Sequence, residues 1–214
     1  PRAPAAWYGT VMQRVFVFAN NKGGSGKSTA TVALALCAHR ALNTPVVVVD
    51  FDGQGSATRM IEAASLPLIA TQKLPDPDVD CLVFVDTPGL DKAATRRAAM
   101  HAHVIVIPVQ MTRVDLEAAL FTMAFARDFK KVSCFLPNRL NGRGACKPEA
   151  VEYSLNLIMR ELKVTWPILP GLRDLAGADQ YLSNEPEHEN RDGRKGKPKF
   201  ESDVRATWAA LRGM

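Results

Sequence analysis

A glycine-rich loop that contains two lysines is the feature of this sequence that most constrains its fold. Residues 21–29 read NKGGSGKST, and they lie between a short apolar run and a helical pattern. Glycines in such a loop let successive backbone N–H groups turn toward one point, which forms an anion site at the N-terminus of the following helix. The sequence therefore predicts a phosphate-binding loop between the first strand and the first helix.

The loop also supplies the side chains that a nucleotide phosphate needs. Lys27 is placed to reach the β- and γ-phosphates, and the Ser28 hydroxyl is placed to bind Mg²⁺. An unliganded glycine-rich turn is the alternative interpretation, but it leaves this combination of residues unexplained. The predicted cofactor-binding residues of the loop are Gly23, Gly24, Ser25, Gly26, Lys27, Ser28 and Thr29.

The rest of the chain alternates between short apolar runs and helical patterns. Strands are predicted at residues 15–19, 45–50, 81–86, 104–107, 132–136 and 164–169. Helices are predicted at residues 28–42, 92–101, 115–129, 148–162 and 201–212. Continuous apolar strands are typical of a sheet buried on both faces. The fold class is therefore α/β, with a doubly wound, mainly parallel sheet and helices on both faces, as in P-loop NTPases.

A second phosphate-site element is predicted at residues 83–89, which read VFVDTPG. The apolar run brings Asp86 to the carboxyl edge of the sheet, where ligands bind in doubly wound folds. Asp86 is therefore a candidate Mg²⁺ residue that acts through water, and the backbone N–H of Gly89 is a candidate γ-phosphate contact. Thr87 follows Asp86 where a glutamate would supply a strong base, so slow hydrolysis is expected.

The phosphate loop departs from the common GxxxxGK[ST] pattern, because Asn21 stands where that pattern has glycine and Lys22 adds a second lysine. The arrangement Lys-Gly-Gly-x-Gly-Lys-[Ser/Thr]-Thr resembles the deviant Walker A box of the ParA/MinD family of P-loop ATPases. This resemblance implies that Lys22 reaches across a nucleotide-sandwich dimer to the partner's phosphates. In the plainer interpretation, Lys22 is only a loop cation.

Residues 47–56, VVVDFDGQGS, resemble the second motif of the same family, with Gly53 in place of the usual proline. The resemblance implies that Asp52 orients the attacking water and that Asp50 supports the Mg²⁺ site. Two carboxylates at a strand end are otherwise ordinary turn residues. The implied catalytic residues are Lys22, Lys27 and Asp52, and the implied metal residues are Ser28, Asp50 and Asp86.

Weaker resemblances follow along the chain. Residues 108–110 and 115–119 resemble the segment that lines the family's dimer interface. Asn138 stands where the family places an adenine-contacting asparagine, and Pro170 belongs to a stretch that closes over the base. Ordinary strand-end turns are the alternative at both positions.

Composition narrows the class of protein. The chain has 214 residues, of which 47% are hydrophobic and 23% charged, as is usual for a globular domain. Four well-separated cysteines without a CxxC pair indicate reduced thiols and a cytoplasmic protein. They also argue against a reductase of the nitrogenase type, which needs cysteines that bind a cluster. These residues are Cys37, Cys81, Cys134 and Cys146.

One domain is predicted for residues 12–214, and residues 1–11 are interpreted as upstream or appended sequence, with Met12 as the natural start. The resemblance spans residues 12–182. It points to the small single-domain ParA-like members, because only 34 residue steps separate Asp52 from Asp86. We also expect no helix-turn-helix before Met12, where there is no room for one. A polar, basic segment is expected at residues 184–199, followed by the C-terminal helix.

The resemblance implies an ATPase with slow, Mg²⁺-dependent turnover that dimerises with ATP and is associated with the nucleoid. Such a protein binds DNA without sequence preference and positions a plasmid, chromosome or protein cargo with a ParB-like adaptor. A net charge of +5 permits a polyanionic partner. The candidate DNA-binding residues are Arg191, Arg194, Lys195, Lys197 and Lys199, although a basic loop of this kind is often merely solvated.

A MinD-like membrane-associated ATPase is the alternative, because the C-terminal helix carries an apolar stripe. Its residues are Phe200, Val204, Trp208 and Leu211. The helix is short and has two acidic residues in its first turn, so packing against the domain is the expected use of the stripe. A membrane partner is not expected.

Overall fold

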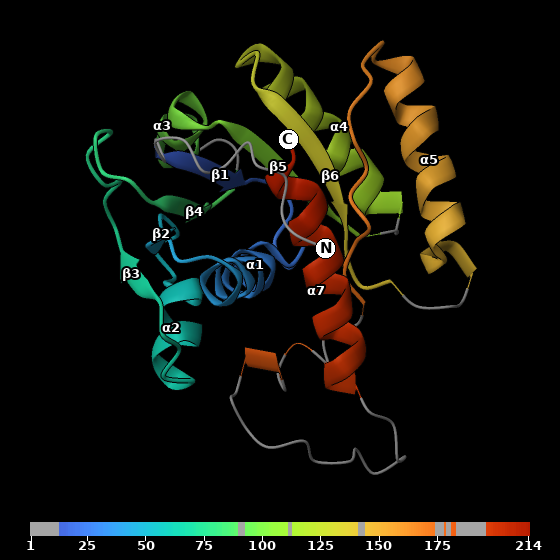
Figure 1. Ribbon diagram of the computed structural model, residues 1–214. Coiled ribbons are helices and arrows are strands. Elements are labelled where there is room, and N and C mark those ends of the chain that lie inside the picture. The colour runs from blue at the N-terminus through green and yellow to red at the C-terminus, as the bar shows by residue number, and fades with distance from the viewer. Residues whose placement is uncertain are drawn as a thin grey trace.

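In the computed structural model, six parallel strands form one sheet in the order β3-β2-β4-β1-β5-β6 (Figure 1). The structure describes residues 13–89, 93–110, 113–140, 144–173, 178, 181–182 and 196–214. The strands are β1 (Arg14–Phe18), β2 (Val46–Asp50), β3 (Ile69–Thr71), β4 (Leu82–Asp86), β5 (Val104–Val109) and β6 (Val132–Pro137). The predicted parallel α/β fold is confirmed.

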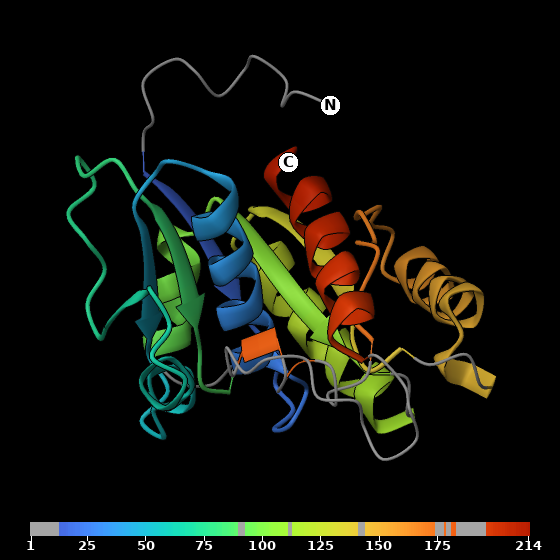
Figure 2. The same ribbon diagram turned by 60° about the horizontal axis from the view of Figure 1, so that its bottom comes forward.

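Helices cover both faces of the sheet (Figures 1 and 2). One face packs against α1 (Lys27–Ala41), α2 (Ser56–Ala63) and α7 (Gly196–Arg212). The other face packs against α3 (Ala93–His101), α4 (Arg113–Asp128) and α5 (Pro148–Glu161), and a short 3₁₀ helix (Gly144–Cys146) precedes α5. The central strands are buried on both sides, which explains why their sequences are continuous apolar runs.

The apolar stripe of α7 lies in the hydrophobic core. Phe200, Val204, Trp208 and Leu211 are each at most 3% exposed. The Trp208 ring lies 5.8 Å from Phe16 and 5.7 Å from Phe84, measured between ring centroids. The expectation that this stripe packs against the domain is confirmed. Within the part of the chain that the structure describes, no helix combines the length and apolar character needed to cross a bilayer.

The predicted strand at residues 164–169 is wrong. This segment runs beside β6 but forms only an isolated parallel bridge between Phe135 and Ile168. Phe135 N–H donates to Pro167 O, and Leu169 N–H donates to Phe135 O, both at 2.9 Å. Pro167 has no N–H to donate toward Ser133 O, and Pro137 of β6 has none to donate toward Leu169 O, so a regular ladder cannot continue on either side of the bridge.

Among the elements that the structure describes, β3, α2 and the short 3₁₀ helix were not predicted. β3 has three residues at the edge of the sheet, and Ile69 is 63% exposed, so it lacks the buried apolar run of the other strands. α2 follows the aspartate turn after β2 and buries only Ala57 and Ile61. The C-terminal helix begins at Gly196, five residues before the predicted start, so the end of the expected polar segment is helical.

The register of the strands brings two of the predicted acidic residues, Asp50 and Asp86, next to each other. Phe18, Asp50 and Asp86 are paired across β1, β2 and β4, so they stand at the same level at the carboxyl ends of the strands. In Figure 2 these ends point downward, and the phosphate loop follows β1 there. The topology therefore assembles the predicted motifs at one edge of the sheet.

Candidate nucleotide-binding site

The phosphate loop joins β1 to α1 and ends in a bare helix N-terminus. Gly24 and Gly26 have φ angles of +72° and +88°, which glycine adopts without steric cost. Gly26 caps α1 and has no side chain to satisfy the first N–H groups of the helix. These groups are thus available to an anion, as a phosphate site requires.

Lys27 begins α1 and lies inside the loop. Its side chain is largely buried, and its Nζ donates to Lys22 O at 3.2 Å. Burial lowers the pKa of the Lys27 ammonium, and the nearby carboxylates of Asp86 and Asp52 oppose that change. The loop therefore contains a partly desolvated cation that can be stabilised by a phosphate.

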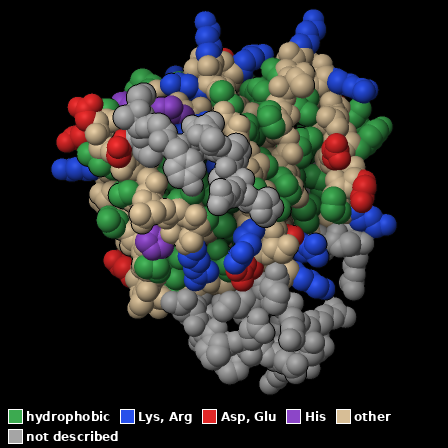
Figure 3. Space-filling model, in the orientation of Figure 1, with side chains coloured by type: hydrophobic (Ala, Val, Ile, Leu, Met, Phe, Trp, Pro, Cys, Tyr) green, Lys and Arg blue, Asp and Glu red, His purple; other side chains and the backbone are tan. Residues whose placement is uncertain are grey.

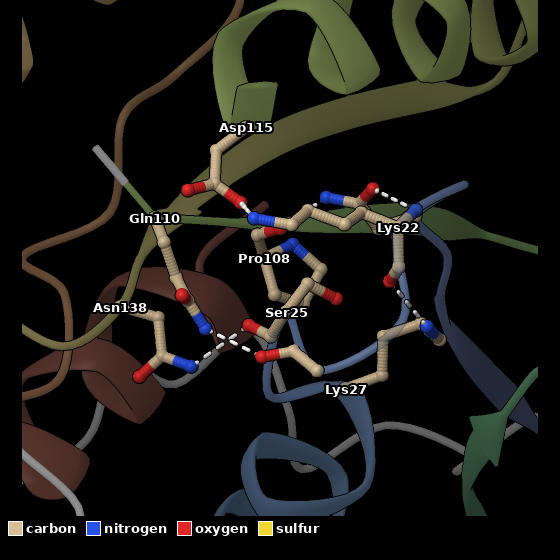
Figure 4. Close-up of polar contacts among 9 residues, drawn as sticks. Lys22, Ser25, Lys27, Pro108, Gln110, Asp115 and Asn138 are labelled. Atoms are coloured by element: carbon tan, nitrogen blue, oxygen red, sulfur yellow. Dashed lines mark hydrogen bonds and ion pairs between the residues drawn. The ribbon is translucent and has the colours of Figure 1, made fainter. Parts of the chain in front are cut away.

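Lys22 is held by α4. Its Nζ forms an ion pair with Asp115 Oδ1 at 2.5 Å, and its backbone N–H donates to Asn20 Oδ1 at 2.8 Å (Figure 4). Asp115 is 1% exposed, whereas the Lys22 side chain remains 31% exposed. Lys22 and Lys27 therefore have different surroundings, one at the surface beside α4 and the other within the loop.

Asp86 is the residue best suited to a metal. It is 0% exposed, and within the described residues neither carboxylate oxygen has a hydrogen-bond partner with good geometry. Burial raises the pKa of Asp86 to about 7, and the Ser28 hydroxyl nearby partly counteracts this rise. An orphaned carboxylate beside a hydroxyl matches the oxygen ligands that Mg²⁺ prefers.

The described residues contain no group of three or more His, Cys, Asp or Glu that could hold a metal ion. This agrees with the usual way that Mg²⁺ binds in nucleotide sites, through one or two carboxylates together with phosphate oxygens and water. The side chains of Ser28 and Asp86 therefore fit a nucleotide-bound Mg²⁺.

Asp50 organises the turn that carries Asp52. Its Oδ1 accepts from Asp52 N–H at 3.1 Å, and its Oδ2 accepts from the backbone N–H and hydroxyl of Thr58 at 2.9 and 3.1 Å. Asp52 is half-buried, and its Oδ1 accepts from Gln54 N–H at 3.1 Å. The structure thus gives Asp50 a supporting position and leaves Asp52 closer to solvent.

Asn138 lies against the phosphate loop. Its Nδ2 donates to Ser25 O at 3.0 Å, and the residue is 4% exposed (Figure 4). Pro170 is exposed, and it precedes Gly171 and Leu172, which pack beside the end of β6. Asn138 and the segment that contains Pro170 are therefore neighbours, although the contact of Asn138 is with the loop.

The predicted DNA-binding residues fall mostly outside the described part of the chain. Arg191, Arg194 and Lys195 lie outside the described residues, and Lys197 is in α7 without a described side chain. Lys199 is exposed on α7. Figure 3 shows Lys and Arg side chains in several places on this face, some of them over α7.

Two contacts to the loop were not predicted from the sequence. Gln110 Nε2 donates to Gly24 O at 2.5 Å, and Thr122 Oγ1 accepts from Asn21 N–H at 3.3 Å. Gln110 directly follows β5, and a polar residue at the carboxyl end of a central strand was the available signal. Thr122 lies in the middle of α4 and gives no such signal.

The matching family model covers residues 16–174 and describes a CobQ/CobB/MinD/ParA nucleotide-binding domain. The chain belongs to this family. The predicted resemblance to ParA and MinD is confirmed, and the model spans the phosphate loop, both acidic motifs and Asn138.

Two curated relatives match about half of the chain. The maintenance of carboxysome distribution protein A of Gloeobacter kilaueensis is 35% identical over 121 residues, which cover 51% of this chain and 55% of the relative. Protein ParA of Rhizobium radiobacter is 31% identical over 115 residues, which cover 47% of this chain and 50% of the relative. The chain thus spans about half the length of the curated relatives that it matches.

Among solved structures, the chain is similar to Cyanothece McdA in a D38A–ATP complex. The TM-score is 0.65 at 14% identity, and the match covers 96% of each chain. At this identity the likeness establishes the fold alone.

Proposed function

We propose that this protein is a Mg²⁺-dependent ATPase of the ParA type, which dimerises with ATP and positions a cargo on DNA. The observation that carries the proposal is the pair of lysines in one phosphate loop. Lys27 is buried within the loop, while Lys22 is on its outer side and partly exposed. Membership of the nucleotide-binding family and similarity to a ParA and to a carboxysome-distribution protein support this function.

In the proposed reaction each group has a separate task. The N–H groups at the start of α1 and the Lys27 ammonium hold the phosphates, as a helix N-terminus and a desolvated cation favour negative charge. Ser28 and Asp86 would hold Mg²⁺, which neutralises charge on the phosphate oxygens. Asp52 orients the attacking water, and Asp50 keeps the turn of Asp52 in place through Thr58.

Turnover is expected to be slow, well below the median of about 10 s⁻¹ for enzymes. Thr87 stands beside Asp86, and its hydroxyl donates to Phe18 O at 2.7 Å, so it is not poised as a base. Asp52 is half-buried, and its Oδ1 accepts from Gln54 N–H at 3.1 Å. An enzyme of this kind acts as a timer whose hydrolysis an adaptor can stimulate.

Replacing Asp52 with alanine is expected to preserve ATP binding and to reduce hydrolysis by at least about 100-fold, since a positioned proton acceptor contributes about 10²–10⁴-fold. Single-turnover assays with γ-labelled ATP measure the chemical step, and equilibrium binding measures affinity. Normal turnover in this variant would remove Asp52 from the water-positioning role.

Asp52→Asn is the matched control for the turn. It retains an oxygen that can accept from Gln54 N–H, so it preserves the local hydrogen bond while it removes the charge. Asp52→Asn is expected to hydrolyse ATP as slowly as Asp52→Ala. Full activity of the asparagine variant would mean that the side chain only shapes the turn.

The DNA partner is proposed to be bound by basic residues that dimerisation brings to one face. Two of the described arginines near Lys199 are already paired, Arg205 with Glu201 at 2.7 Å and Arg173 with Asp203 at 3.1 Å. The modest excess charge of one copy makes two copies acting together the more effective arrangement. Each phosphate contact made once per copy counts twice in a dimer.

Replacing Arg191, Arg194, Lys195, Lys197 and Lys199 with alanine is expected to flatten the salt dependence of DNA binding by the ATP form. Each neutralised phosphate contributes roughly 0.9 to the slope of log affinity against log salt. Fluorescence anisotropy with a random-sequence duplex measures the slope. A control variant that removes exposed charges elsewhere, at Lys73, Arg97 and Arg127, is expected to keep the slope.

An unchanged slope in the five-residue variant would place the DNA-binding face elsewhere. Binding of the ATP form to anionic vesicles, with no binding to DNA, would favour the MinD-like alternative. The burial of Phe200, Val204, Trp208 and Leu211 counts against that alternative, because these residues are already packed in the core.

A further inference from the structure

Two amide side chains donate hydrogen bonds to backbone carbonyls of the phosphate loop. Gln110 Nε2 donates to Gly24 O at 2.5 Å, and Asn138 Nδ2 donates to Ser25 O at 3.0 Å (Figure 4). Gln110 is 8% exposed and Asn138 is 4% exposed. The bond of Asn138 to Ser25 O is buried, and the bond of Gln110 to Gly24 O is partly buried. The accepting carbonyls belong to consecutive residues of the loop.

The two amides come from the carboxyl ends of two neighbouring strands, β5 and β6. Gln110 and Asn138 each directly follow a strand, and the last residues of these strands, Val109 and Pro137, are paired in register. Asn138 N–H also donates to Val109 O at 2.7 Å, which extends the pairing by one step. The sheet therefore fixes the spacing between the two donors.

A second observation shows that the Asn138 amide packs closely against the loop. A Cβ atom at Gly26 would lie only 1.9 Å from Asn138 Nδ2, so the amide occupies the space beside this glycine. The Oδ1 of Asn138 accepts from Arg139 N–H at 2.9 Å, which orients the amide group. The loop and Asn138 are thus fitted to one another at Gly26, whose φ is +88°.

The direction of these bonds determines where the loop N–H groups point. In a trans peptide, the N–H lies opposite the C=O of the preceding residue. Holding Gly24 O and Ser25 O toward the two amides therefore turns the N–H groups of Ser25 and Gly26 away from β5 and β6. In the ligand-free protein, the N–H groups of Ser25 and Gly26 therefore already point toward the opposite side of the loop.

We propose that Gln110 and Asn138 are positioning residues that hold the phosphate loop in its binding-ready conformation. The proposal rests on the proposed function in that the ligand is a nucleotide phosphate. It gives Asn138 a role that differs from the adenine contact expected from the sequence, because a loop clamp acts on every nucleoside triphosphate alike. Preorganisation of this kind strengthens binding by reducing the ordering that the ligand must impose.

Gln110→Met and Asn138→Ala test the clamp, since both remove the donor without adding charge. Each is expected to weaken Mg²⁺-ATP binding and Mg²⁺-GTP binding by the same factor, about 10-fold, because a loop carbonyl loses the donor that orients it. Hydrogen–deuterium exchange of the ligand-free protein is expected to show faster exchange of the loop amides at residues 24–27. Thermal unfolding establishes that each variant is folded.

Gln13→Met is the matched control. The Gln13 amide donates to Pro75 O and Asp76 O at 3.2 and 2.9 Å, at the other end of β1, so its loss is expected to leave nucleotide affinity and loop exchange unchanged.

Unchanged loop exchange in both clamp variants would overturn the proposal. A selective loss of ATP over GTP in Asn138→Ala would overturn it for Asn138 and would assign that residue to the base. If the unaltered protein bound neither nucleotide, the proposed function would fail, while the exchange experiment would still decide whether the amides hold the loop.

Discussion

Replacing Lys27 with alanine is expected to weaken Mg²⁺-ATP binding by about 100- to 1000-fold. Lys27 Nζ is inside the loop, where burial lowers its pKa and makes the bare ammonium costly. A bound phosphate would then lose a charge-assisted contact in a partly desolvated site, and breaking a buried ion pair from one side costs about 3–5 kcal/mol. Isothermal titration calorimetry measures this change.

Two controls separate the loss of charge from a collapse of the loop. Lys73→Ala removes an exposed lysine and is expected to bind ATP normally. Lys27→Met keeps the aliphatic stem and loses only the bond to Lys22 O and the charge, so it should bind as weakly as Lys27→Ala. Near-normal ATP affinity in both Lys27 variants would place the phosphates outside this loop.

Lys22→Ala is expected to bind ATP within a few-fold of the unaltered protein but to remain monomeric. Lys22 Nζ is tied to Asp115 rather than turned into its own loop, and its side chain is partly exposed. A second cation on the outer side of the loop is best used against phosphates of another copy, where contacts in a dry interface are strong. Multi-angle light scattering with ATP measures the mass.

Asp115→Asn is the control for the ion pair. The Asp115→Asn substitution weakens the contact between Lys22 and residue 115 but retains the Lys22 ammonium. Dimerisation with ATP is therefore expected to persist. A stable ATP dimer of Lys22→Ala would exclude the cross-dimer role. Loss of the dimer in both variants would instead indicate that the ion pair shapes the interface from within one copy.

The buried strands and the phosphate loop could be predicted because local chemistry dictates them. An apolar run such as the one in β4 suits only a strand covered on both faces, and glycines at positions 24 and 26 permit the positive φ angles that the loop adopts. The edge strand β3 lacks such a run, because its side chains are largely solvent-accessible. Residues 164–169 do not form a regular strand because Pro167 lacks an N–H donor, and the pattern of apolar residues does not take a missing donor into account.

The environment of each lysine could not be predicted, because it depends on residues distant in the sequence. Lys22 meets Asp115 across 93 positions, and Ser25 meets Asn138 across 113. The sequence predicted that Lys22 and Ser25 lie in the phosphate loop, Asn138 after a strand, and Asp115 in a segment that resembles a dimer interface. Only the packing of α4 and β6 against the loop determines which of these groups touch. The loop contact of Asn138 was therefore outside the reach of motif reasoning.

Sedimentation velocity of the unaltered protein with a fluorescent random-sequence DNA duplex tests the central claim most directly. Three samples are compared, with Mg²⁺-ATP, with Mg²⁺-ADP and without nucleotide. The protein is expected to sediment as a dimer, and to carry DNA with it, only in Mg²⁺-ATP. The same monomeric sedimentation in all three samples, with the DNA left free, would contradict a ParA-type positioning ATPase.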